Sequence, residues 1–144
     1  MEDSMYHYYV ESIERVVDGD TVDVIIDLGF DLFKHERIRL AGIDTPEKRT
    51  RNLEEKELGV DASVWLEEQL VDALAYENLI IRTEREKQSG KYGRTLGWLW
   101  LESNDVSINE QMITEGYAWP YDGGTKEKNL EDLRAIRREM GTLK

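Results

Sequence analysis

The sequence of 144 residues predicts an α+β fold, mainly a barrel of five short β-strands with about three helices. Several short segments alternate apolar and polar residues, which is typical of half-buried strands. One longer segment carries apolar residues at helical spacing and lies between the third and fourth of these strands. No repeat, low-complexity tract or Pro/Gly/Ser-rich linker divides the chain. Residues 1–144 are therefore expected to form a single domain.

The five strands follow from their residue patterns and from turn signals. The first two, joined through an Asp-Gly turn, should pair as a hairpin. In the third, Ile38 and Leu40 should face away from Arg37 and Arg39, because side chains alternate between the two faces of a sheet. The last is rich in aromatic residues, as buried strands often are. The predicted ranges are 8–17, 20–29, 37–43, 78–85 and 93–102.

Three helices are predicted, at 58–75, 107–116 and 129–141. The second begins with a capping box of Ser107 and Glu110 and ends at Gly116. The third ends at Gly141, and its expected apolar stripe is Leu130, Leu133, Ile136 and Met140. The expected apolar positions of the first helix are Val60, Val64, Val71 and Leu74, with Leu66, Leu70 and Ala73 beside them. This order of elements is that of an OB-fold barrel, although a mixed α+β sandwich fits the periodicity nearly as well.

Composition excludes several classes of protein. The chain has no cysteine, so disulfides and thiolate zinc sites are excluded. No apolar run approaches the roughly 18–20 residues that a membrane span needs. The first ten residues, MEDSMYHYYV, lack the basic start and apolar centre of a signal peptide, which fits a cytoplasmic location without requiring it. The net charge of −12 argues against a protein that coats nucleic acid by bulk charge.

Acidic side chains occur in two clusters beside strand ends. Asp18 and Asp20 flank a glycine ahead of the second strand, and taken alone they indicate a turn. Asp44 and Glu47 follow the third strand, with Thr45 between them. Taken alone, Asp44 or Thr45 would cap a helical turn, and Glu47 would support that cap. Both clusters thus have a purely local interpretation.

The two clusters together indicate a cation site. Strands two and three are neighbours in the predicted meander, so Asp20, Asp44 and Glu47 are expected to converge. Unpaired carboxylates at close range repel one another and raise one another's pKa, and a divalent cation relieves that repulsion. Because the ligands are oxygen atoms with no Cys or His nearby, the residues predict a hard cation, either Ca²⁺ or Mg²⁺.

Two arginines accompany these acids. Arg39 lies on the third strand, and Arg94 follows a Gly-containing turn in SGKYGRTLGW, residues 89–98. A guanidinium group offers a planar pair of donors that matches phosphate oxygens. Arginines, a hard cation and a carboxylate that orients water are what phosphodiester hydrolysis requires. Taken singly, either arginine could instead form a surface salt bridge.

The segments VVDGDTV, RLAGIDTPE and KYGR, in this order, resemble the staphylococcal nuclease (thermonuclease) family. The resemblance runs from about Tyr9 to Gly116 and more loosely through the last helix. It implies an OB-type barrel with three helices. It also implies cleavage of DNA and RNA with one calcium ion, leaving 3′-phosphate products.

The resemblance also implies roles for individual residues. The calcium ligands would be Asp20, Asp44 and the backbone carbonyl of Thr45, with Asp18 as a further acid near the metal. The catalytic groups would be Glu47, as general base or water-orienting residue, and the phosphate-binding pair Arg39 and Arg94. Lys91 and Tyr92 would line the nucleotide site.

The chain departs from the family in two regions. The segment between strands two and three, residues 27–36, is expected to be a longer loop. The segment after Gly116 differs from the family pattern, and there Tyr121 and Trp119 are candidates for stacking on a base. The acids of residues 52–86, which carry a net charge of −7, are expected to face away from the site. That would leave a local basic rim made of Arg37, Arg39, Lys48, Arg49, Arg51, Lys87, Lys91 and Arg94.

Three functions remain open from the sequence. The leading one is a calcium-dependent phosphodiesterase acting on DNA, RNA or both, expected to be a monomer that does not associate with membranes. The second is a non-catalytic OB-type module that binds single strands or a protein partner. The third is an assembly component whose acidic face docks a basic protein, supported only by the charge of residues 52–86.

Overall fold

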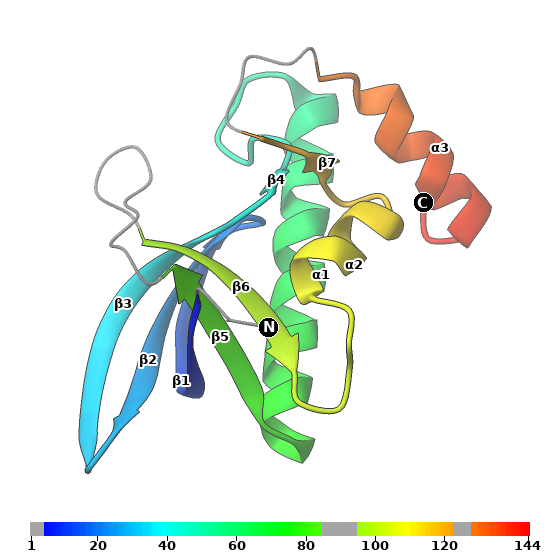
Figure 1. Ribbon diagram of the computed structural model, residues 1–144. Helices are drawn as coiled ribbons and strands as arrows, with labels where there is room; N and C mark the ends of the chain where they lie inside the picture. Colours follow the sequence, from blue (N-terminus) through cyan, green and yellow to red (C-terminus); the bar gives the residue numbers. More distant parts are fainter. Residues whose placement is uncertain (1–4, 85–94, 123–127) are drawn as a thin grey trace.

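A computed structural model describes residues 5–84, 95–122 and 128–144 of the chain (Figure 1). Five strands form a closed barrel in the order β1-β2-β3-β6-β5, which confirms the predicted barrel. Neighbouring strands are antiparallel except β3 and β6, which run parallel. The barrel strands are β1 (Met5–Asp18), β2 (Thr21–Gly29), β3 (Leu32–Leu40), β5 (Leu79–Glu84) and β6 (Thr95–Leu101).

Three helices and a small second sheet complete the described structure. The long helix α1 runs beside the barrel, and α2, β7 and α3 lie on the same side of the molecule (Figure 1). The second sheet joins β4 and β7 at one end of the barrel. These elements are β4 (Ile43–Asp44), α1 (Leu53–Tyr76), α2 (Ile108–Thr114), β7 (Trp119–Pro120) and α3 (Leu130–Met140).

The barrel interior is filled by the alternating residues of its strands. On β2 the fully or almost fully buried residues are Val22, Val24 and Ile26. On β3 Ile38 and Leu40 are fully buried, so the predicted orientation of that strand is confirmed. Because Ile38 and Leu40 face inward, Arg39 points to the outer face of the barrel at the end of the strand, where neighbouring residues cover most of its side chain.

The expected loop at residues 27–36 is instead a tight hairpin. β2 continues to Gly29 and β3 starts at Leu32, so only Phe30 and Asp31 form the turn. Both have positive φ, 56° and 60°, as a two-residue hairpin turn of the I′ type requires. This end of the hairpin projects beyond the core and most of its side chains are exposed, so the strands there lack the alternation that marks a half-buried strand.

Helix α1 begins five residues earlier than predicted, after Asn52. The Asn52 side chain caps the helix by accepting from the backbone N–H groups of Glu54 and Glu55. The predicted apolar stripe was wrong in part, because Val60, Val64 and Val71 are exposed. The buried face instead contains several small residues, which let the helix approach the barrel closely: Leu58, Gly59, Ala62, Ser63, Trp65, Leu66, Leu70 and Ala73.

A buried arginine fastens α3 to α1. Arg137 donates to Asp61 Oδ2 of α1 at 2.9 Å and to the Thr142 carbonyl at 2.7 Å. Its guanidinium lies 4.5 Å from the ring centroid of Tyr117, which stacks on Trp65. The stripe predicted for α3 is therefore corrected: Met140 is exposed, whereas Leu133 and Arg137 are buried.

The capping signals predicted for the last two helices are confirmed. Ser107 Oγ accepts from the backbone N–H of Glu110 and donates to its carboxylate. Gly116 and Gly141 both have positive φ just after their helices, as expected of a glycine that ends a helix. None of the helices within the described ranges combines the length and the apolar character needed to cross a bilayer.

Candidate active site

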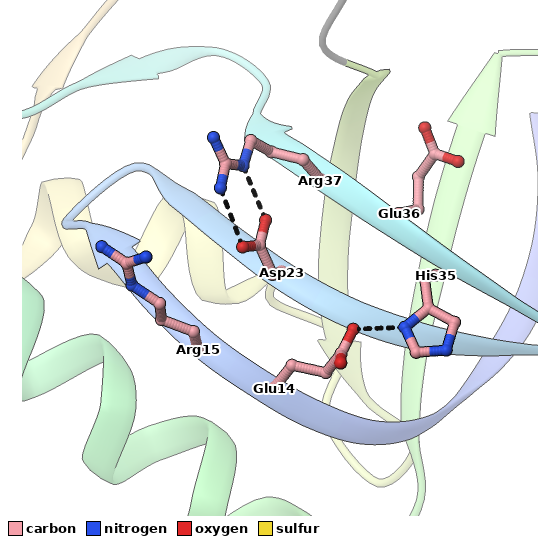
Figure 2. Close-up of a pocket in the computed structure, with 6 residues that line it drawn as sticks. All are labelled: Glu14, Arg15, Asp23, His35, Glu36 and Arg37. Carbon is pink, nitrogen blue, oxygen red and sulfur yellow. Dashed lines mark hydrogen bonds and ion pairs between the residues drawn. The ribbon is translucent and has the colours of Figure 1, made fainter.

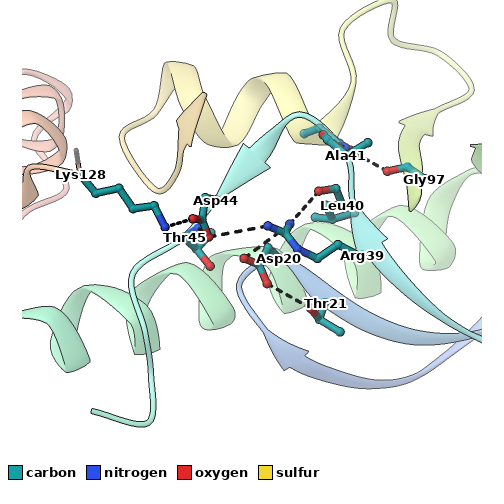
Figure 3. A network of polar contacts seen from close by, with 10 residues as sticks. Asp20, Thr21, Arg39, Leu40, Ala41, Asp44, Thr45, Gly97 and Lys128 are labelled. Atoms are coloured by element: carbon teal, nitrogen blue, oxygen red, sulfur yellow. Dashed lines mark hydrogen bonds and ion pairs between the residues drawn. The ribbon is translucent and has the colours of Figure 1, made fainter. Parts of the chain in front are cut away.

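The two predicted acidic clusters meet at one end of the barrel (Figure 3). Asp20 lies just before β2, Arg39 near the end of β3, and Asp44 in β4. The backbone N–H of Leu40 donates to the Asp20 carbonyl at 2.8 Å, which ties the start of β2 to the end of β3. The result is a cavity of about 280 Å³ lined by Asp18, Asp20, Arg39, Asp44, Thr45, Pro46 and Glu47.

Arg39 lies between the two predicted metal ligands. Its Nη1 is 3.5 Å from Asp20 Oδ2, and its Nη2 is 3.7 Å from Asp44 Oδ1. Nη1 also donates to the Leu40 carbonyl at 2.8 Å, and only 11% of the side chain is exposed. The guanidinium is therefore held in one orientation, with an oxygen of each carboxylate beside it.

Asp20 is buried, so ionisation of its carboxyl group is energetically unfavourable. Burial raises the pKa of Asp20, and the Asp44 carboxylate raises it further, whereas Arg39 and the hydroxyls of Thr21 and Thr45 lower it. The Thr21 hydroxyl donates to Asp20 Oδ1 at 3.0 Å. The outcome is a raised pKa, so the nearby donors do not fully compensate the buried carboxylate.

Both oxygens of Asp44 have partners. Oδ1 accepts from the backbone N–H of Thr45 at 3.0 Å. Oδ2 forms an ion pair with Lys128, and this contact raises the pKa of the Lys128 ammonium group. Lys128 was not predicted from the sequence. The available signal was weak, since residues 125–144 carry a net charge of only +2.

Glu47 lines the same cavity but is exposed to solvent. Partial burial raises the pKa of Glu47, and the negative charges of Asp20, Asp18 and Asp44 raise it further. Residues 45–47 form no helix, so the interpretation of Glu47 as part of a helix cap does not apply. Its carboxylate is thus available at the mouth of the cavity.

The acids of α1 do not all face away from the site, contrary to the prediction. Glu55, in the first turn of α1, accepts from the backbone N–H of Glu47 at 3.0 Å. Its charge is one of those that raise the pKa of Glu47. The prediction failed because α1 starts five residues earlier than expected, which brings its acidic first turn against the loop that carries Glu47.

The remaining predicted site residues fall into two groups. Arg94, Lys91 and Tyr92 lie within residues 85–94, outside the described part of the chain, so their roles remain predictions. Tyr121 lies near the site, because its backbone N–H donates to the Gly42 carbonyl at 2.9 Å. Trp119 is buried and its indole N–H donates to the Asn129 carbonyl at 3.1 Å, so its ring is used in packing rather than presented to a base.

The chemistry of the cavity suits a hard cation. Its acidic lining offers only oxygen atoms, and burial together with the neighbouring carboxylates raises the pKa of Asp20 and of Glu47. Within the described ranges, no three or more His, Cys, Asp or Glu side chains are grouped so as to hold a metal ion by themselves. A cation here would therefore depend on the carboxylates of Asp20 and Asp44 together with backbone oxygen and water.

A larger hollow, of about 420 Å³, lies on the outer face of β1, β2 and β3 (Figure 2). Four of its side chains form two pairs, Arg37 with Asp23 and His35 with Glu14. Arg37 donates to both oxygens of Asp23, at 2.7 and 2.9 Å, and this contact holds the pKa of Asp23 below its usual value. His35 Nδ1 lies 2.7 Å from Glu14 Oε1. Arg37 is thus committed to Asp23, and the predicted basic rim is weaker at that position.

Comparison with known proteins identifies a family and several relatives. Residues 37–140 match the family model described as staphylococcal nuclease homologue. The chain is 31% identical to Protein ParB of Escherichia coli over 136 residues, which cover 90% of this chain and 67% of that protein. It is 36% identical to the thermonuclease of Staphylococcus intermedius, over 74% of this chain and 56% of that protein. It is 31% identical to the micrococcal nuclease of Shigella flexneri, over 76% and 56% respectively.

These matches cover most of this chain but only about half to two thirds of the relatives' own lengths. The family match includes Arg39, Asp44, Thr45 and Glu47, and the closed five-stranded barrel with three helices agrees with it. The chain belongs to the staphylococcal nuclease homologue family.

Proposed function

We propose that this protein is a calcium-dependent nuclease that hydrolyses phosphodiester bonds of DNA, RNA or both. The observation that carries the proposal is the meeting of Asp20 and Asp44 on either side of Arg39, with Glu47 on the same cavity. The names of the relatives support the reaction type, since several are nucleases.

In this proposal each group has one task. Asp20, Asp44 and the Thr45 carbonyl hold one calcium ion, which supplies Lewis-acid stabilisation of charge on the phosphoryl oxygens when it is bound. Arg39 donates to the same phosphoryl oxygens, and its fixed orientation means that little reorganisation is needed during the reaction. Arg94 is assigned the same task from the family resemblance.

Glu47 is assigned the role of general base. It accepts a proton from water, whose oxygen bonds to phosphorus as the bond from phosphorus to the 5′ oxygen breaks. The 5′ oxygen takes up a proton, and the 3′-phosphate product remains. The raised pKa of Glu47 suits this role, because a general base works best when its pKa approaches the operating pH. Lys91, Tyr92 and Tyr121 are assigned to binding the nucleotide, and Asp18 to supporting the cation site.

The test is degradation of plasmid DNA and of a defined RNA by the purified protein. We expect cleavage in calcium, loss of cleavage in excess EDTA, and poor restoration by zinc. Arg39→Lys, prepared in parallel, should lower kcat by about 10²-fold or more, which also controls for contaminating nucleases. Full activity in EDTA would contradict the metal assignment. Binding of single strands without cleavage would favour the non-catalytic module instead.

A further inference from the structure

Lys128 contacts a carboxylate that we assign to the cation site. Its ammonium nitrogen forms an ion pair with Asp44 Oδ2, on the side of Asp44 opposite Arg39 (Figure 3). It is also 5.8 Å from the ring centroid of Tyr121. Lys128 is thus a second cation at a site whose first cation, Arg39, follows from the sequence motif.

The fold places Lys128 there through Trp119. Trp119 is paired with Asp44 in the sheet formed by β4 and β7. Its indole N–H donates to the carbonyl of Asn129, the residue that caps α3 and directly follows Lys128. Helix α3 is in turn fastened to α1 by the Arg137–Asp61 ion pair. The position of Lys128 beside Asp44 is therefore supported by the contacts of the residues that follow it in the chain.

The two cations differ in how firmly they are held. Arg39 is 11% exposed and donates to a backbone carbonyl as well as facing both carboxylates. The Lys128 side chain is 43% exposed, and among the described residues its ammonium group has only Asp44 as a hydrogen-bonding partner. Asp44 itself is only 14% exposed, so its charge needs a cationic partner, and Lys128 is the less firmly held of the two cations that another cation can replace.

We propose that Lys128 is an exchangeable phosphate-binding residue of this site. It neutralises Asp44 while no metal is bound, leaves Asp44 when a divalent cation takes that oxygen, and then donates to a substrate phosphate. The ammonium group has three donors on a long side chain, which suits a contact to phosphate oxygens. The inference rests on the proposed function, because it requires that Asp44 binds a cation.

This role predicts opposite effects on two ligands. Lys128→Met removes a competitor for Asp44 and a repelling charge, so calcium should bind about three- to tenfold more tightly. The matched control is Lys34→Met, which makes the same change on the exposed outer part of β3, where Lys34 pairs with Glu36. Isothermal titration with calcium measures both variants without any cleavage reaction. Equal affinities of the two variants would overturn the inference.

The second readout is binding of a short labelled single-stranded oligonucleotide, measured by fluorescence anisotropy. Both lysine variants are made in a Glu47→Gln background, so that cleavage of the oligonucleotide is slowed during the binding measurement. In calcium, Lys128→Met should weaken binding by about three- to tenfold relative to Lys34→Met, the scale of one lost charged contact. In EDTA the two variants should bind the oligonucleotide with equal affinity, because Lys128 of the unmodified site is then paired with Asp44 and does not contact the phosphate.

The outcomes separate the inference from the proposed function. If the unmodified protein binds no calcium in the titration, both the calcium assignment and the exchange role of Lys128 are contradicted. If it binds calcium but the oligonucleotide binds equally to both variants, only the inference fails. An equal loss of binding with and without calcium would make Lys128 a permanent phosphate ligand and would also overturn the exchange.

Discussion

Burial raises the pKa of the Asp20 carboxylate, whereas Arg39 and the hydroxyls of Thr21 and Thr45 lower it. The pKa remains raised, so these groups compensate the burial only in part. The folded protein keeps the Asp20 proton at pH values where the unfolded chain, with a pKa of 3.8, has released it. Through this group, the free energy of unfolding therefore falls as the pH rises from 3.8 through the raised pKa. A bound cation would remove this penalty at neutral pH.

Asp20→Asn should therefore stabilise the metal-free protein at pH 7. The amide keeps the shape of the carboxylate but carries no buried charge, so the melting temperature in EDTA should rise by a few degrees. Near pH 3.5 the difference should be much smaller, because Asp20 is then mostly protonated in both states. Thermal unfolding in EDTA at pH 7 and at pH 3.5 measures this difference in melting temperature. A lower melting temperature for the variant at pH 7 would show that Arg39 compensates the charge fully.

Glu47→Gln tests the general base. The side chain is exposed and caps no helix, so stability should change by less than about 0.5 kcal/mol. Removing the base should lower kcat by about 10²–10⁴-fold. The control is Glu55→Gln, the same change in a neighbouring acid whose amide oxygen can still accept from the Glu47 backbone. Loss of stability with an unchanged rate would return Glu47 to a structural role.

At this scale the sequence predicted part of the site. Asp20, Arg39, Asp44 and Glu47 could be brought together because motifs and a meander place them at adjoining strand ends. The place of Lys128 at the site could not be predicted, because it depends on the contact between Trp119 and Asn129, which no local pattern encodes.

At the scale of elements, helix α1 supports the loop that carries Glu47. A Cβ atom at Gly59 of this helix would lie 2.7 Å from the Pro46 carbonyl oxygen and 2.8 Å from that of Glu47. Glycine in a helix interior costs about 1 kcal/mol relative to alanine. The close approach of the loop explains why the helix carries glycine here.

Gly59→Ala should therefore destabilise the protein, although alanine has the higher helix propensity. Because backbone atoms would have to move, we expect a loss of about 1–3 kcal/mol in the free energy of unfolding. The rate should also fall, since Pro46 and Glu47 would be displaced. Val60→Ala, at the exposed neighbouring position, is the control and should change little. Chemical denaturation and a cleavage assay measure both effects, and a stabilised Gly59→Ala variant would contradict the packing described here.

The same helix shows what periodicity alone could not predict. The sequence predicts that the helix exists, but it places the start five residues too late and assigns the valines to the core, whereas Val60, Val64 and Val71 are exposed. Small residues form part of the buried face of α1. They stabilise the packing by letting the helix approach its neighbours closely rather than by burying apolar area. The hairpin at Phe30 and Asp31 was missed for a related reason, because strands that extend beyond the core carry no alternation.

At the scale of the whole molecule, acidic residues outnumber basic ones. The chain has 31 acidic and 19 basic residues, Arg37 is paired with Asp23, and Glu55 lies beside Glu47. Arg37 is therefore not available to a phosphate, and the net charge of −12 repels nucleic acid at long range. Long-range attraction of nucleic acid should be weak, and binding should depend on contacts within the site.

The salt dependence of KM should reflect this distribution. With about two phosphates neutralised, KM for a short single strand should rise by less than about tenfold between 50 and 200 mM salt. The measurement is the initial rate on a labelled oligonucleotide at constant calcium. An increase of 10³-fold or more would require at least about six phosphate contacts and would contradict the limited cationic surface.

The central claim is that the cavity between Asp20 and Asp44 is the calcium-dependent catalytic centre. The most direct test is a calcium titration of cleavage activity for the unmodified protein and for Asp44→Asn, with Asp23→Asn as a control in the neighbouring hollow. Removing one of the two carboxylate ligands should raise the calcium concentration needed for half-maximal activity by at least about tenfold, because ligand charge sets calcium affinity. The control should match the unmodified protein in its calcium requirement. An unchanged calcium requirement for Asp44→Asn would contradict the account and place the metal elsewhere.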